Sequence, residues 1–242
     1  MKLAYPESPY LLFGFYKQGV GAPELGLRLL ELVAARGATP ISGIARVPGP
    51  NAVTGSSFGD LAEALVWFRG LDRESFFELE LVVPAGRKKA ETELLGNWRP
   101  QIGAAYTPVV SISMGGSAFE PHAGGSPDRE GREAYARFLW LCEEAAPTYA
   151  AISVEWDLES PEELIEDPRS YAFHDFYLGD ALGPLIHSQA ISTNKDAFSQ
   201  RTGGGLYIST NRWFNPKSIH TPSDSASGKV GRLLADQLSS AR

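Results

Sequence analysis

The sequence has little cysteine and no long apolar run. Cys142 is the single cysteine of the 242 residues, so the chain cannot form an internal disulfide, and a reducing compartment is the simplest assumption. No apolar run approaches the roughly 18 residues that a membrane-spanning helix needs. The stretch 1–16 carries one lysine and is interrupted by Pro6 and Pro9, which makes a poor signal peptide. We therefore expect a cytoplasmic protein that does not bind a membrane.

Positive charge is also scarce. The chain carries 22 Lys and Arg residues against 29 Asp and Glu residues, which gives a formal net charge of -7. The only basic run is Arg87, Lys88 and Lys89, and two glutamates follow it closely. Because phosphate contacts need clustered Lys and Arg, this balance argues against nucleic acid as a partner. An acidic surface instead favours a basic macromolecular partner, or serves only solubility.

Motifs for catalysis and for cofactor binding are missing as well. The chain has no G-x-S-x-G nucleophile elbow, and its glycine clusters fit neither the Walker A loop nor the dinucleotide fingerprint. The four histidines are scattered, whereas a metal site needs ligands at close spacing: His122, His174, His187 and His220. We therefore expect no metal, no cofactor and no catalytic residue, and a binding protein is favoured over an enzyme.

What the chain does contain is an alternation of strand and helix patterns. In residues 10–83 the expected order is strand, helix, strand, helix, strand, at 10–16, 23–37, 40–47, 58–68 and 76–83. Pro23 suits a first helical turn, and Gly37 is placed to end that helix. The stretch 48–57 is rich in Pro, Gly, Asn and Ser and is expected to be a loop. Residues 84–108 are expected to form a boundary or a long connection.

The same order recurs in residues 108–178. Strands are expected at 109–114, 149–156 and 173–178, with helices at 128–145 and 160–168 between them. Cys142 shares an apolar helical face with Phe138, so we interpret it as a core residue. Ser160, Pro161 and Glu163 have the pattern of a capping box.

We interpret the two stretches as β-α-β-α-β pseudo-repeats, 10–83 and 108–178, of one compact α+β domain over residues 1–242. The alternative is a chance match of common elements. The two repeats would share a sheet or pack through their sheets, as one layered unit of sheet and helices. An extension, 179–242, adds a strand at 206–214 and a terminal helix at 229–238.

Two carboxylates stand out at the end of the strand expected at 149–156. Alternation places Glu155 and Asp157 on one face of this strand and Trp156 on the other. These acids could be only the polar end of a strand, or they could act with His174 in a hydrolase. In a third interpretation they lie at the rim of a partner-binding surface with an aromatic anchor. The candidate partner-binding residues are then Glu155, Trp156, Asp157, His174, Asp175 and Trp213.

Three features carry a resemblance to a known group of proteins. They are the compact acidic α+β composition, the segment PTYAAISVEWDLESPEEL (147–164) after a long amphipathic helix, and the late segment GGGLYISTNRWFNP (203–216). In these features the chain resembles the immunity proteins of bacterial polymorphic toxin and contact-dependent secretion systems. The resemblance covers the C-terminal part of the chain and transfers no family residue to a position here. It implies tight binding that blocks a cognate toxin, without catalysis.

Our leading hypothesis is a cytoplasmic, non-catalytic protein-binding module that neutralises a toxin by direct binding. The acidic balance predicts a basic toxin domain as the partner. Two alternatives stay open: a hydrolase that uses Glu155, Asp157 and His174, and a structural subunit of a phage or secretion particle. The sequence leaves the protein as a monomer or a dimer.

Overall fold

The computed structural model describes residues 10–46, 53–73, 75–82, 101–104, 109–115, 127–154, 158–166, 175–190, 198–209 and 226–240. Its strands are β1 (Tyr10–Tyr16), β2 (Thr39–Arg46), β3 (Val53–Ser57), β4 (Phe76–Val82), β5 (Gln101–Ala104), β6 (Val110–Gly115), β7 (Tyr149–Val154), β8 (Asp175–Gly179), β9 (Phe198–Thr202) and β10 (Gly205–Ser209). Its helices are α1 (Ala22–Ala35), α2 (Leu61–Arg69), α4 (Pro127–Ala145), α5 (Pro161–Glu166), α6 (Gly183–Ala190) and α7 (Ala226–Ser240). The chain is therefore α+β, as the sequence predicts.

The described strands form one ten-stranded sheet, in the order β3-β2-β4-β5-β6-β1-β7-β8-β10-β9. Every neighbouring pair is antiparallel. β1 lies near the middle, where Phe13 is opposite Ile112 of β6 on one side and Ile152 of β7 on the other. The first described strand thus joins the segments on both sides of it into one sheet.

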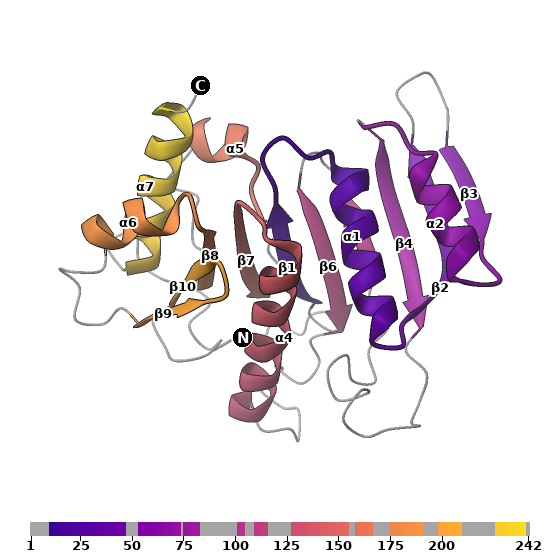
Figure 1. Ribbon diagram of the computed structural model, residues 1–242, viewed down its shortest axis with the longest axis horizontal. Helices are drawn as coiled ribbons and strands as arrows, with labels where there is room; N and C mark the ends of the chain where they lie inside the picture. Colours follow the sequence, from indigo (N-terminus) through magenta and orange to yellow (C-terminus); the bar gives the residue numbers. More distant parts are fainter. Residues whose placement is uncertain are drawn as a thin grey trace, which may run out of the picture.

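Helices cover the two faces of this sheet unequally (Figure 1). The face built on Phe13 and Phe15 packs against α1, α2 and α4, which are spread along the sheet. The other face has its own apolar cluster, which includes Phe176 of β8 and Leu206 of β10, and it packs against α5, α6 and α7. These three helices gather at one end of the sheet, near β8 and β10.

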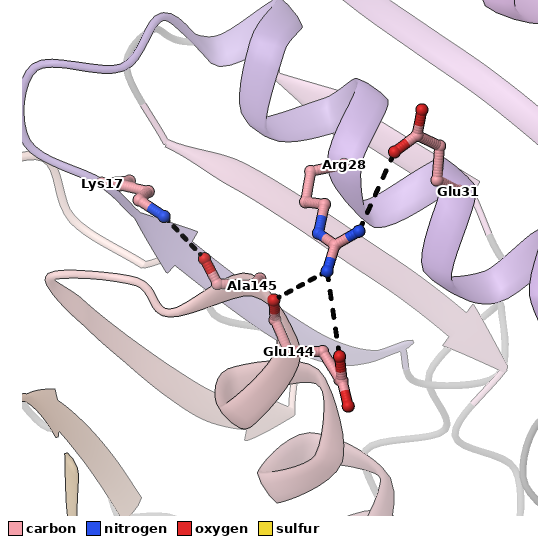
Figure 2. A network of polar contacts seen from close by, with 5 residues as sticks. All are labelled: Lys17, Arg28, Glu31, Glu144 and Ala145. Carbon is pink, nitrogen blue, oxygen red and sulfur yellow. Dashed lines mark hydrogen bonds and ion pairs between the residues drawn. The ribbon is translucent and has the colours of Figure 1, made fainter. Parts of the chain in front are cut away.

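The C-terminal end of α4 is tied to the β1–α1 connection and to α1 by two basic side chains (Figure 2). Lys17 Nζ donates to the carbonyl oxygen of Ala145 at 2.9 Å, and Arg28 Nη2 donates to that of Glu144 at 3.2 Å. Arg28 also forms ion pairs with Glu144 at 3.8 Å and with Glu31 at 3.9 Å. The last carbonyls of a helix lack partners within the helix and carry partial negative charge, so both contacts satisfy and stabilise this end.

Several local signals of the sequence are confirmed. The capping box of α5 is formed: Ser160 N donates to Glu163 Oε2 at 2.7 Å, and Glu163 N donates to Ser160 Oγ at 3.3 Å. Gly37 follows α1 with a φ of 94°, a left-handed conformation that suits glycine. Cys142 is fully buried in the core, and burial raises the pKa of its thiol well above the ordinary value.

Three strands, β3, β5 and β9, lie where none was expected from the sequence, and the loop and the connection expected in place of β3 and β5 were wrong. β3 lies inside the expected loop 48–57, and β5 lies inside the expected connection 84–108. Neither segment, VTGSS or QIGA, shows the apolar alternation that identifies a strand. Both are strands because neighbouring strands offer them hydrogen-bonding edges: β2 for β3, and β4 and β6 for β5.

The order of elements predicted for 10–83 and 108–178 is present in both stretches, with β3 as an addition to the first. Their positions in the sheet differ. The chain from β1 to β2 passes over β6, β5 and β4, whereas the chain from β6 to β7 passes over β1 alone. The pseudo-repeat itself stays a prediction. In the C-terminal extension the strand expected at 206–214 is observed as β10, and residues 210–214 lie outside the described ranges.

The residue after α4 gives a test of local strain. Ala146 has a φ of 46°, and this left-handed conformation costs a residue with a Cβ about 1–2 kcal/mol. Glycine avoids that cost but loses more entropy on folding, about 0.5–1 kcal/mol. We expect Ala146→Gly to raise the free energy of unfolding by about 0.5–1 kcal/mol in urea titration. The matched variant Ala136→Gly, within α4, should lower it by a similar amount. Equal destabilisation by both variants would contradict the strain.

Candidate partner-binding surface

The structure describes one of the six residues predicted to bind a partner, Asp175. The other five, Glu155, Trp156, Asp157, His174 and Trp213, lie outside the described residues. Their roles at a partner surface, and the hydrolase that would use three of them, stay predictions.

Asp175 is the first residue of β8 and is 1% exposed. Tyr207 Oη donates to one of its carboxylate oxygens, and Ser209 Oγ donates to the other at 2.5 Å. Both hydroxyls come from β10, the neighbour of β8 in the sheet. The ring of Tyr207 packs against Tyr135 of α4, with 4.8 Å between ring centroids. Asp175 is therefore an interior group that links two strands beneath a helix, and it presents no surface to a partner.

Burial raises the pKa of Asp175 from 3.8 to about 7, although the hydrogen bonds from Ser209 and Tyr207 act to lower it. A buried carboxylate without these two donors would be costlier still. Tyr207 and Ser209 occupy alternate positions of β10, so the sequence indicates that their hydroxyls lie on one face of this strand. Their partner could not be identified there, because the register of β8 against β10 is a tertiary property.

One hollow of about 290 Å³ lies between the start of α1 and the end of α2. Its lining includes Leu27, Phe68, Arg69 and Arg73 and none of the six predicted residues. Arg73 Nη2 already donates to the carbonyl oxygen of Gly19 at 3.0 Å. Within the described part of the chain, no three His, Cys, Asp or Glu side chains are grouped so that they could hold a metal ion.

The most distinctive surface is the sheet face away from α2 at the β3 end. A Cβ added to Gly43 would meet Trp67 and Phe58 on the helix side, so the next residue, Ile44, points to the opposite face. Ile44 is 49% exposed, and Val53, diagonal to it on β3, is 57% exposed. No described helix packs there, because α5, α6 and α7 lie at the other end of this face.

The neighbours of Ile44 on this face follow from the strand register. Ile44 is opposite Glu78 of β4 and Gly55 of β3. Two residues along β2, Ser42 is opposite Glu80, and Ser42 Oγ donates to Glu80 Oε2 at 3.3 Å. This surface combines exposed aliphatic side chains with carboxylates beside them, a composition that suits a protein interface. We call it the open face, and it consists of Ser42, Ile44, Arg46, Val53, Gly55, Glu78 and Glu80.

The sequence analysis did not identify the open face. The sequence predicted a strand at 76–83, and in the observed β4 the alternate residues Glu78 and Glu80 lie on one face. A loop was expected at 48–57 in place of β3, and without β3 Ile44 would lie on an edge strand with no Val53 beside it.

Comparisons with known proteins leave the family open. No protein-family model matches the chain, and no curated protein matches it. Among solved structures, the chain is similar to the Pseudomonas aeruginosa T6SS protein PA0821, with a TM-score of 0.39 and 10% sequence identity. That match covers 96% of this chain and 87% of the other. None of the described helices is both long and apolar enough to cross a membrane.

The buried carboxyl gives a test by pH. The unfolded state releases the Asp175 proton near pH 3.8 and the folded state near pH 7, so the folded state binds more protons between these values. The contribution of this group to the free energy of unfolding is therefore complete below about pH 4 and falls by roughly 4 kcal/mol as the pH rises to 7. Urea unfolding between pH 4 and 8 should show this fall in the wild type and not in Asp175→Asn.

Tyr207→Phe is the matched variant for this experiment. It removes a hydrogen bond that lowers the pKa of Asp175, so the fall in stability should extend to higher pH than in the wild type. Parallel pH curves for the wild type and Asp175→Asn would contradict a raised pKa.

Proposed function

We propose that this protein is a non-catalytic binding module that neutralises a cognate bacterial toxin, and that the open face contacts the toxin. The observation that carries the proposal is the exposure of Ile44 and Val53 beside Glu78 on a sheet face that no described helix covers. The resemblance to immunity proteins supplies the biological setting and the expectation that binding alone is the activity.

The exposed large apolar side chains are concentrated at this end of the described structure. Ile41, Ile44, Val53 and Val66 belong to β2, β3 and α2, and Leu185 of α6 is the remaining one. Burying such side chains against a partner removes apolar area from water, which is the main favourable contribution to most protein association. Of these side chains Ile44 and Val53 lie on the open face, so this face offers apolar area that a partner can cover.

The charge of the chain favours a basic partner. Glu78 and Glu80 lie on the open face with one basic residue, Arg46, and the whole chain has a formal net charge of -7. Complementary charge speeds encounter and selects against wrong partners more than it adds affinity. A basic toxin domain would thus be steered toward the chain, and the aliphatic side chains would hold it.

The test uses the full chain and the product of the gene immediately upstream of its own. The two proteins should form a complex on size-exclusion chromatography, and the chain should protect cells that express the upstream product. Ile44→Asp should weaken the complex at least about tenfold, which corresponds to about 1.4 kcal/mol, because it places a charge where an apolar contact is made.

Leu185→Asp is the matched control. Leu185 is also 49% exposed, but it lies on α6 at the other end of the sheet, so the variant should bind like the wild type. Equal weakening by both variants would remove the open face from the proposal. Absence of both a complex and protection in the wild type would overturn the proposed function.

A further inference from the structure

β3 is the last strand at its end of the sheet, and among the described strands it pairs with β2 alone. The other side of β3 is therefore an edge with backbone N–H and C=O groups that no described strand uses. Such an edge is a template for pairing with an extended segment of another chain. The backbone groups of β3 that point away from β2 are the ones that can form hydrogen bonds with an added strand.

One hydrogen bond fixes the direction of these groups. Phe58 N donates to the carbonyl oxygen of Ile41 at 2.8 Å, so the amide directly after β3 points toward β2. In an antiparallel strand the backbone groups of successive residues point to alternate sides. The amides of Thr54 and Ser56 therefore also point toward β2, and those of Val53, Gly55 and Ser57 point out of the sheet.

This edge lacks the features by which proteins usually protect an edge strand. β3 reads VTGSS, without a charged residue or proline, and its pairing with β2 is regular across all five residues. Four of the five residues are exposed and Ser56 is half-buried. A Cβ added to Gly55 would meet no atom within 4 Å, so the open face has free space above this residue.

We propose that β3 receives an extended strand of a basic partner protein, which continues the sheet at this edge while the adjoining chain of the partner covers Ile44. This inference rests on the proposed function and names the way in which the partner is held. Main-chain hydrogen bonds to Val53, Gly55 and Ser57 supply the pairing, and the open face supplies the side-chain contacts.

A second copy of the chain fits the edge less well than a basic partner does. Two copies would each bring a formal net charge of -7. Pairing of β3 with β3 of another copy would also extend the sheet in its own plane, which leaves Ile44 of both copies in water. Five paired residues alone fall well short of the roughly 1,200 Å² that a stable interface buries.

Gly55 allows a matched pair of variants. Gly55→Pro removes an outward N–H and spares the hydrogen bonds to β2, since proline is tolerated on an edge strand where its nitrogen faces solvent. Gly55→Ala adds a Cβ in the same place and keeps the N–H. The backbone at Gly55 is not left-handed and the space above it is open, so Gly55→Ala should unfold within a few degrees of the wild type, and the thermal unfolding of Gly55→Pro is measured beside it.

Binding is measured with the purified product of the upstream gene by titration calorimetry. Gly55→Ala should bind like the wild type, and Gly55→Pro should lose at least about tenfold in affinity. Wild-type affinity in Gly55→Pro would overturn strand addition and leave the proposed function in place. No binding by the wild type would overturn both. A wild type that dimerises in light scattering, with a monomeric Gly55→Pro, would make a second copy the occupant and overturn the basic partner.

Hydrogen exchange on the wild type decides between the outcomes if Gly55→Pro fails to fold. In the complex the amides of Val53, Gly55 and Ser57 should exchange at least about 100-fold more slowly than in the free chain, because each gains a hydrogen-bond partner. Unchanged exchange of these three amides in a complex that does form would overturn strand addition.

Discussion

Hydrogen bonding along both edges of β1 holds the sheet together. β1 is the first of the described strands, yet its neighbours β6 and β7 follow it only after a long stretch of sequence. Its side chains also supply much of the core on the α1 side, with Leu11, Phe13 and Phe15 almost fully buried. Without β1 the strands on its two sides would be two separate sheets. The position of β1 between β6 and β7 is therefore what makes the described strands a single sheet.

The same strand helps to shape the second face. A Cβ at Gly14 would lie 2.3 Å from the Cβ of Leu158, so glycine lets the segment before α5 pack directly on β1. From there the cover of α5, α6 and α7 extends toward β8 and β10 and away from β3. The open face is the part of this side that the three helices leave uncovered. It exists because they concentrate at one end of a ten-stranded sheet.

Polar groups inside the protein and apolar groups on its surface show how differently the two ends are built. At one end Asp175 is enclosed and satisfied by Tyr207 and Ser209, which fixes β8 against β10. At the other end Ile44 and Val53 face water beside an edge strand without protection. The hydrogen bonds of the first arrangement satisfy a polar group inside the fold, whereas the second arrangement leaves apolar side chains exposed to water. That contrast is the physical reason for assigning partner binding to the β3 end.

The sequence by itself determined the α+β class and nearly all helices and long strands, because their signals are local. Ser160 and Glu163 cap a helix within four residues of each other, and apolar periodicity marked Cys142 as a core residue. It could not determine β3 or β5, whose residues become strands only because β2, and β4 and β6, offer them hydrogen-bonding edges. Nor could it place Asp175 inside or Ile44 outside. Those outcomes depend on strand order and register, which are set by pairing between segments far apart in the chain.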